Sequence, residues 1–325
     1  MTTGTGGMAL AEASNAFIYA TMLTLTIAMV FFAASFASGR RPSTAKAAAQ
    51  ASAAGTGSDS GPIAVLDRPD GSSSLDAGRR LANIGMSLTW LATGLLTIAL
   101  VLRGLWAGRV PWGNMYEFSI SSAWGVLVVF LAMSLRRDLR WLGLFVVIPA
   151  LLTLGLSVTV LYTEAAQLVP ALKSYWLVIH VSAAIVCAGA FTVAASSAGL
   201  SLVQSRREAS GRVWGGPMAS MPSAERLQTF TSRIIAFAFP VWTFSVIAGA
   251  IWAENAWGRY WGWDPKETWA FITWVVYAAY LHARSTAGWR GNKASWIAIV
   301  GLVTFLINYF GVNIFVNSLH SYAGL

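Results

Sequence analysis

The 325-residue chain is 56% hydrophobic and only 11% charged, with a formal net charge of +9 and a mean hydropathy of +0.59. A soluble globular domain has about 25% charged residues, so this composition excludes one and predicts a polytopic membrane protein. The single cysteine, Cys187, excludes an intrachain disulfide and a CxxC metal pair, and without a CxxCH motif the chain is not a c-type cytochrome.

Eight apolar runs are each about 20 residues long, which is the length that a helix needs to cross a bilayer. They lie at 15–37, 82–102, 118–135, 141–162, 175–203, 234–254, 268–284 and 295–316. The first run has no Lys or Arg before it, whereas Arg40 and Arg41 follow it directly. This polarity is the reverse of a signal peptide, so we expect a retained helix. We therefore predict an all-α polytopic membrane protein with about eight transmembrane helices.

The sequence divides into three parts. Residues 1–37 form an N-terminal transmembrane helix. Residues 38–79 are rich in Ala, Ser, Gly and Asp and have too little apolar content for a core, so we predict a flexible cytoplasmic linker. Residues 80–325 form the main transmembrane domain, which has a tryptophan-rich loop at 255–268 between the sixth and seventh helices. No internal repeat is visible by inspection.

The basic residues predict the orientation in the membrane. Seventeen of the 22 Lys and Arg residues lie in alternate loops. The opposite side has only five, namely Arg103, Arg109, Lys173, Arg259 and Lys266. Positive charge stays on the cytoplasmic side, so we expect both termini and the tryptophan-rich loop to lie outside. The same bias explains the net charge without a nucleic acid or another acidic ligand.

The three histidines all lie on or beside the helices that flank this loop. His180 is roughly 7–8 Å below the outer end of the fifth helix, and His320 follows the last helix on the outside. His282 is about 21 Å down the seventh helix, in the inner half of a core about 30 Å thick. Taken singly, each imidazole could serve only as a hydrogen-bonding or snorkelling group. Neutral imidazole is also a common axial ligand of haem iron.

The stretch WGRYWGWDPKETW at 257–269 differs from an aromatic belt, in which single Trp and Tyr residues mark both interfaces. Its crowded aromatic residues are Trp257, Tyr260, Trp261 and Trp263, with Gly258 and Gly262 between them. Aromatic rings stack on flat π-systems, and glycine lets the backbone approach a ligand closely. The loop is therefore a candidate platform for a porphyrin, the alternative being an interfacial anchor.

Charged residues in the same stretch have a structural interpretation. Asp264, Pro265 and Glu267 form a helix start, with an N-cap acceptor, a proline at the first position and a capping-box carboxylate. Arg259 and Lys266 are candidate partners for a carboxylate on a ligand, such as a propionate.

Two further sets of residues have open interpretations. In the outer loop GNMYEF, Asn114 and Glu117 either support the tryptophan-rich loop or a partner, or simply start the third helix. Cys187 is seven residues after His180 and so lies on nearly the same helix face. A buried cysteine is usually a small apolar residue, so we leave it out of the site.

Five motifs together resemble a known family. WGRYWGWDPKETWA resembles the tryptophan-rich WWD signature of a superfamily of haem-handling membrane proteins. PWGNMYEF, SYWLVIHV, YLHAR and NYFGVNIFVNSLHSYAG are similar to the loop before helix three and to the three histidine segments of the CcsA/ResC family of System II cytochrome c biogenesis. The resemblance extends from about Gly78 to the C-terminus and leaves the N-terminal helix and the linker uncovered.

The resemblance implies a site in which 80–325 is a haem-handling domain. His180 and His320 would ligate the iron of haem b on the outer side. The platform would consist of Trp257, Tyr260, Trp261, Trp263 and Asp264, with Asn114, Glu117, Arg259, Lys266 and Glu267 as supporting residues. His282 would ligate haem within the membrane, with the opposing ligand supplied by a CcsB/ResB-type membrane partner.

The resemblance also implies an activity. The chain would be a subunit of a membrane cytochrome c synthase, a haem lyase that joins haem vinyl groups to the CxxCH cysteines of apocytochrome c after haem transfer across the membrane. A thioredoxin-like protein that reduces thiols would be a further partner. The location would be the plasma membrane, or the thylakoid membrane in a plastid. No catalytic acid or base is assigned, because thiol addition to a vinyl group depends mainly on proximity.

Three other functions fit parts of the pattern. A haem exporter or chaperone would present haem and leave its attachment to other proteins. A transporter for another flat or anionic molecule would use the tryptophans as a gate but would give the histidines no role. A membrane redox cytochrome needs paired histidines at matching depths, whereas His282 is the only histidine at inner depth.

Overall fold

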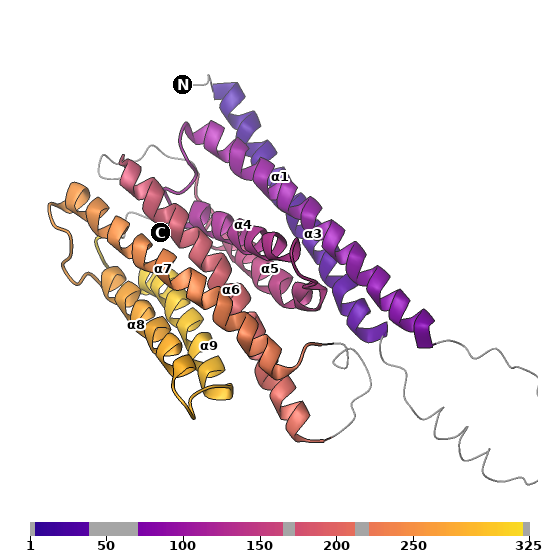
Figure 1. Ribbon diagram of the computed structural model, residues 1–325. Coiled ribbons are helices and arrows are strands. Elements are labelled where there is room, and N and C mark those ends of the chain that lie inside the picture. Colours follow the sequence, from indigo (N-terminus) through magenta and orange to yellow (C-terminus); the bar gives the residue numbers. More distant parts are fainter. Residues whose placement is uncertain (1–3, 39–70, 165–172, 212–220, 321–325) are drawn as a thin grey trace, which may run out of the picture.

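The computed structural model describes residues 4–38, 71–164, 173–211 and 221–320, and within these ranges the regular structure is helical throughout (Figure 1). The elements are α1 (Gly4–Ser38), α3 (Gly71–Ala107), α4 (Met115–Ser134), η1 (Arg140–Leu142), α5 (Gly143–Thr159), α6 (Tyr175–Ala209), α7 (Ala224–Trp257), α8 (Pro265–Ser285), α9 (Asn292–Leu306), η4 (Ile307–Gly311) and α10 (Val312–Phe315). The segment η4 is a π-helix that joins α9 to α10.

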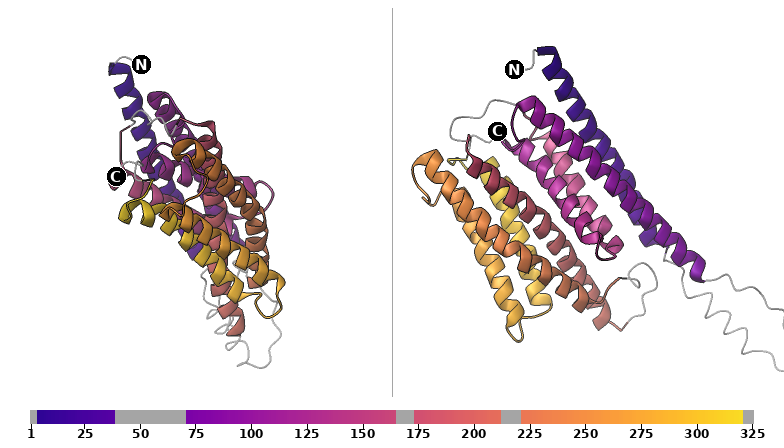
Figure 2. Two further views of the ribbon diagram at one scale, coloured as in Figure 1. Left: turned by 90° about the vertical axis from the view of Figure 1, so that its left-hand side faces the viewer. Right: turned by 45° about the horizontal axis from the view of Figure 1, so that its top comes forward.

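The helices form three adjacent groups. Figures 1 and 2 show α1 and α3 side by side on one flank, α4 to α6 in the middle, and α7 to α9 on the other flank. Helix α6 is the most buried of the candidate spans, and it packs against α4, α7 and α9. It can do so because much of its buried face consists of alanine, serine and glycine, and small residues let membrane helices approach closely.

Glycines mark the closest approaches between helices. The ring of Phe32 on α1 fills the space that Gly85 on α3 and Gly143 on α5 leave, because a Cβ at Gly143 would lie only 2.3 Å from that ring. Helices α4 and α6 meet at Gly125 and Gly189, where a Cβ on Gly189 would lie 2.5 Å from the Gly125 carbonyl oxygen. Replacing these glycines with larger residues would therefore push neighbouring helices apart.

Each predicted apolar run coincides with a helix, and the predicted all-α multi-pass membrane fold is confirmed. Among the described residues, seven helices are long and apolar enough to cross a membrane, and α8 is the predicted run that does not meet this standard. Its 21 residues include Lys266 and Glu267 near one end, His282 and Arg284 near the other, and several Trp and Tyr residues between them. These polar and aromatic residues lower the hydropathy of α8 below that of the other predicted runs.

Parts of the sequence-based division fall outside the described residues. Most of the predicted linker at 38–79 is among them, although helix α3 already begins at Gly71 within that range. Asn15 near the start of α1 donates to the Tyr162 hydroxyl at 3.2 Å and accepts from the Tyr116 hydroxyl at 3.4 Å. The start of α1 therefore lies at the same end of the bundle as the start of α4. The side of the membrane that this end faces stays a prediction.

Candidate functional site

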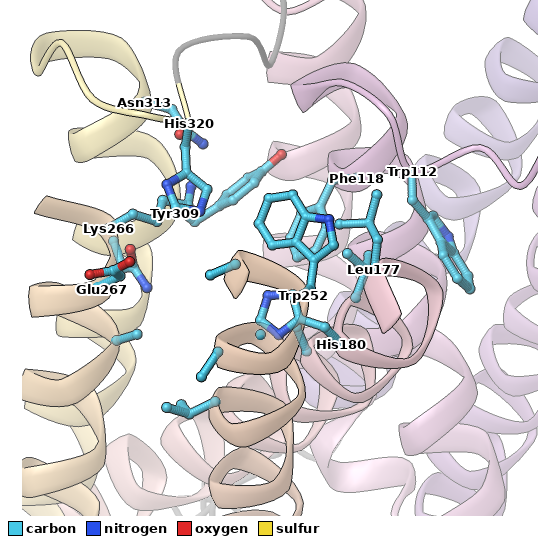
Figure 3. Close-up of a pocket in the computed structure, with 18 of the residues that line it drawn as sticks. Trp112, Phe118, Leu177, His180, Trp252, Lys266, Glu267, Tyr309, Asn313 and His320 are labelled. Atoms are coloured by element: carbon cyan, nitrogen blue, oxygen red, sulfur yellow. The ribbon is translucent and has the colours of Figure 1, made fainter. Parts of the chain in front are cut away.

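A pocket lies at this end of the bundle, between α4, α6, α7, α8 and the segment from η4 to the C-terminal tail (Figure 3). Its empty space, including the open mouth, is about 1160 Å³. Because this figure includes space that is open to solvent, the site is a cleft with a wide mouth and not an enclosed cavity. Its lining is mostly apolar and aromatic, and it includes both His180 and His320.

His180 is held in one orientation by helix α7. Its Nδ1 lies 2.7 Å from the carbonyl oxygen of Ser245, and the Ser245 hydroxyl donates to the His180 carbonyl oxygen at 3.0 Å. A carbonyl oxygen only accepts, so Nδ1 carries the proton and Nε2 presents a lone pair. Gly249 makes room for the ring, since a Cβ there would lie 2.8 Å from its Cε1 and Nδ1 atoms. This is how a metal-ligating histidine is usually oriented.

His320 has an equivalent arrangement with a carboxylate. Its Nδ1 lies 3.0 Å from Asp264 Oδ2, and the backbone N–H of Leu319 donates to Asp264 Oδ1 at 2.9 Å. Burial lowers the pKa of His320, and this outweighs the raising effect of Asp264. The imidazole is therefore neutral at pH 7, donates from Nδ1 and has its lone pair on Nε2. Both histidines present the nitrogen that a metal ion would bind.

Asp264 has two roles. Its side chain caps α8 by accepting from the Lys266 N–H, which confirms the predicted N-cap, and it also holds the C-terminal tail through His320 and Leu319. Burial raises the pKa of Asp264, but the hydrogen bonds from His320 and Leu319 outweigh this effect and lower the pKa below its usual value. The carboxylate is therefore ionised when it binds the imidazole.

The predicted aromatic platform divides between two places. Trp257, Tyr260 and Trp261 line the pocket, and the Trp257 ring packs edge-on against the His320 ring with centroids 4.9 Å apart. Trp263 instead contacts Trp261 and Phe271, is 63% exposed, and has a φ of 57°, which is rare for a residue other than glycine. Its ring belongs to the outer surface of the loop.

Sequence analysis missed several aromatic residues that line the pocket. These are Trp112, Phe118, Trp242, Trp252, Phe305 and Tyr309. Ser245, Gly249 and Trp252 follow one another at intervals of four and three residues, so they share the face of α7 that points to His180. This spacing, read from the two polar or small residues within an apolar run, could have indicated the face.

Glu267 organises the tryptophan-rich loop. It accepts from the Gly262 N–H at 2.8 Å, the Asp264 N–H at 3.0 Å and Arg259 Nη1 at 3.3 Å, which confirms the predicted capping box. Arg259 packs directly against Gly262, since a Cβ there would lie 1.7 Å from Arg259 Nη1 and the arginine side chain would have to move. Arg259 thus contacts the loop itself and does not line the pocket.

Glu117 organises the loop before α4 in the same way. It accepts from the Gly113 N–H at 2.8 Å, Arg109 Nη1 at 2.7 Å and Arg103 Nε at 3.1 Å, and Asn114 caps α4 by accepting from the Glu117 N–H. Glu117 is completely buried and the Arg103 side chain is 1% exposed. The interpretation of Asn114 and Glu117 as the start of α4 is therefore confirmed. The Glu117 carboxylate binds residues on the N-terminal side of α4 and not the tryptophan-rich loop, and a role toward a partner stays a prediction.

The two loops repeat one pattern. The two segments are RVPWGNMYE at 109–117 and RYWGWDPKE at 259–267, and each ends in the buried glutamate. In each, an arginine lies eight residues before the glutamate, and the Asn or Asp that caps the helix lies three residues before it. In both, the glutamate binds the arginine and a glycine N–H of the same loop. This local repeat corrects the expectation of no internal repeat. The pocket thus has two walls of related construction, one at the start of α4 and one at the start of α8.

The remaining candidates lie elsewhere. The His282 side chain is exposed on α8, away from the residues that line the pocket. Cys187 is completely buried, with its Sγ 3.6 Å from the Ala238 carbonyl oxygen, and it does not line the pocket either. Omitting Cys187 from the site was therefore consistent with its placement.

Comparison with known proteins adds the family. The family described as Cytochrome C assembly protein matches residues 112–320, a range that includes most of the first repeated loop, all of the second and all three histidines. The chain belongs to the CcsA family of cytochrome c assembly proteins. It is 38% identical over 259 residues to the Cytochrome c biogenesis protein CcsA of Guillardia theta, covering 74% of this chain and 86% of the relative. To the CcsA protein of Prochlorococcus marinus it is 36% identical over 254 residues, with 70% and 80% covered.

A solved structure shares the fold. The Cytochrome c Heme Lyase CcmF superposes with a TM-score of 0.59 at 15% sequence identity, over 93% of this chain and 46% of that protein. The chain thus spans about half the length of CcmF, and at this identity the likeness supports the fold alone. Membership of the CcsA family places this multi-pass membrane protein in cytochrome c biogenesis.

Proposed function

We propose that the chain binds haem b in the pocket, on the extracytoplasmic side, and presents it for thioether attachment to the CxxCH cysteines of apocytochrome c. The observation that carries the proposal is the pair of imidazoles, His180 and His320. They face one aromatic pocket, and in each the Nδ1 is bound to an oxygen acceptor so that Nε2 can ligate iron.

The chemistry of the pocket fits haem better than a bare metal ion. The described residues contain no group of three or more His, Cys, Asp or Glu side chains that could hold a metal ion. Two imidazoles are sufficient when a macrocycle supplies the other ligands. The apolar lining and the rings of Trp252, Trp257 and Trp261 provide surfaces for a flat, largely apolar molecule.

The contribution of this chain to the reaction is positional. Haem supplies vinyl groups, and the apocytochrome supplies the thiols that add to them. The two histidines would fix the distance of the ring plane from the walls, and the repeated loops would hold those walls rigid through Glu117 and Glu267. Holding the vinyl groups and the thiols close together in a fixed orientation can accelerate the reaction without acid–base catalysis.

His282 indicates a second contact. It lies on the exposed surface of α8, where a neighbouring protein can reach it. We propose that a CcsB/ResB-type membrane partner packs here and supplies the opposing ligand for haem within the membrane, before transfer to the pocket. A thioredoxin-like protein would keep the apocytochrome thiols reduced. The plasma membrane, or the thylakoid membrane in a plastid, is the proposed location.

The proposal is tested by oxidised and reduced absorption spectra of the detergent-purified chain, expressed with haem available. We expect a sharp reduced α-band of low-spin haem in the wild type and in His282→Ala, and its loss or shift in the His180→Ala/His320→Ala double variant. Co-expression with the partner and an apocytochrome then tests covalent attachment. Folded wild-type protein without any haem band, with the partner present, would contradict the proposal.

Gly249→Ala should weaken haem binding without removing a ligand. The added Cβ would overlap the His180 ring and push its Nδ1 away from the Ser245 carbonyl oxygen, so Nε2 would lose its orientation. We expect about a tenfold or larger loss of affinity in a haem titration. Gly155→Ala on α5 is the matched control, because an added Cβ there meets nothing within 4 Å. Equal affinity of the two variants would refute the close packing of His180 on α7.

A further inference from the structure

One side of the pocket contains polar groups that have no hydrogen-bond or ion-pair partner among the described residues. Lys266 lines the pocket next to Tyr309, with its Nζ 5.6 Å from the centroid of the Tyr309 ring. The two carboxylates near it in sequence are occupied, Asp264 by His320 and Leu319, and Glu267 by Arg259 and loop N–H groups. Among the described residues, no carboxylate lies within ion-pair distance of the Lys266 ammonium.

Two asparagines lie in the adjoining wall. Asn308 and Asn313 both line the pocket, and the Oδ1 atom of each is buried without a hydrogen-bond partner in the described part of the chain. Asn308 is only 7% exposed. A buried amide without a hydrogen bond costs about 1–3 kcal/mol, so such groups usually face a ligand or an ordered water. Since neither side chain hydrogen-bonds to another described residue, either end of each amide can turn into the pocket.

The helix that carries these asparagines departs from regular α-helical geometry. Asn308 lies in the π-helix η4, and Asn313 follows five residues later in α10. Single π turns inside α-helices are rare and occur frequently at functional sites. Tyr309 between them is fixed, because its hydroxyl donates to the Met115 carbonyl oxygen at 2.7 Å and lies 2.6 Å from Ser119 Oγ. The ring that adjoins Lys266 therefore cannot swing away.

We propose that Lys266, Asn308 and Asn313 form a carboxylate-binding subsite of the pocket, which takes the propionate arms of the haem ring. This inference rests on the proposed function and adds to it. The ammonium and the amide N–H groups donate to the carboxylate, and hydrogen bonds to charged groups are the stronger ones. Figure 3 shows Lys266, Tyr309, Asn313 and His320 near one another, with Trp112 on the far side of the pocket.

The subsite would determine which edge of the ring is presented. Two axial imidazoles fix the ring plane but leave the ring free to turn about the axis through the iron. In haem b the propionates occupy one edge, and the vinyl groups lie on the rest of the ring. Holding the propionates at Lys266 therefore removes this freedom and directs the vinyl groups away from η4. The subsite would thus give the site its preference among porphyrins.

The test is a titration of the full-length, detergent-purified chain with iron protoporphyrin IX and with its dimethyl ester, followed by Soret absorbance and tryptophan quenching. We expect the wild type to bind the free acid about tenfold or more tightly than the ester. Lys266→Gln should lose most of this preference, because its affinity for the free acid should fall more than its affinity for the ester. Lys266→Arg, which keeps the charge, should retain part of the preference.

Matched variants separate the subsite from general charge effects. Lys293→Gln, which removes a lysine that lies over Trp289 outside the pocket, should keep the full preference. Asn308→Ala should also reduce the preference for the free acid over the ester. Equal affinity of the wild type for acid and ester, or equal weakening of both by Lys266→Gln, would overturn the subsite and leave the proposed function intact. Failure of the folded wild type to bind either porphyrin would instead contradict the proposed function.

Discussion

Replacing Glu117 with alanine is expected to lower the free energy of unfolding by about 3–5 kcal/mol, because it leaves buried positive charge without its partner. Glu117 is fully buried, and it binds Arg103, Arg109 and the Gly113 N–H together. The Arg103 guanidinium also lies between the rings of Trp106 and Tyr116, at 4.8 and 4.9 Å from their centroids, so it cannot turn toward water. Thermal unfolding of the detergent-purified protein measures the effect.

The control for this prediction is an ion pair that is exposed to solvent. Asp138 binds Arg140 at 3.2 Å, but its side chain is 63% exposed, so Asp138→Ala should change stability by less than about 1 kcal/mol. Glu117→Gln is a second control, because it keeps the shape and an acceptor for the Gly113 N–H and removes only the charge. A melting temperature for Glu117→Ala as close to the wild type as that of Asp138→Ala would show that the Glu117 cluster is not what stabilises this loop.

The overall fold was predictable because membrane helices are encoded by length and composition. A run of about 20 apolar residues can satisfy its backbone hydrogen bonds in lipid only as a helix, so each run had one available structure. The start of α8 was also predictable, because Asp264, Pro265 and Glu267 each match a local requirement of a helix N-terminus. Such features depend on neighbours in the sequence and not on the tertiary structure.

The lining of the pocket was less predictable for a related reason. In a membrane helix both faces are apolar, so the periodicity of apolar residues does not distinguish the face that meets a ligand from the face that meets lipid. On α7 only the polar or small residues Ser245 and Gly249 mark that face. Trp242 and Trp252 therefore looked like other apolar residues of α7, although both are almost completely buried beside the pocket. Asn308 was missed because a π turn changes which residues share a helix face, and the sequence does not show where such a turn occurs.

The loop repeat shows a further limit of sequence analysis. The segments 109–117 and 259–267 share an Arg, an Asn or Asp, and a Glu at matching positions, but the residues between these positions are dissimilar. The Trp–Gly pair is also shifted by one position between the two loops. What the loops share is a set of hydrogen bonds around a buried glutamate, which only the structure displays. The placement of Trp257, Tyr260 and Trp261 at the pocket could be inferred from aromatic crowding, but crowding alone did not separate them from Trp263, which does not line the pocket.

Asp264→Asn is expected to lower the affinity for haem about 10–100-fold, the usual effect of removing the group that orients a metal-ligating histidine. Asparagine caps a helix as well as aspartate does, so α8 should form normally and the thermal stability of the haem-free protein should change little. The substitution instead removes the charge that holds His320 Nδ1 at 3.0 Å. The reduced spectrum should therefore lose low-spin haem.

Asp264→Ala and Ser223→Ala complete the design. Asp264→Ala removes both the cap and the histidine partner, so it should reduce haem affinity and also stability, by roughly 1 kcal/mol for the cap. Ser223→Ala removes only a cap, since Ser223 accepts from the Arg226 N–H at the start of α7, and it should leave haem affinity unchanged. If Asp264→Asn bound haem as tightly as the wild type, Asp264 would be only a helix cap. His320 would then have to be oriented by the fold of the tail and by its contact with Trp257, not by the carboxylate.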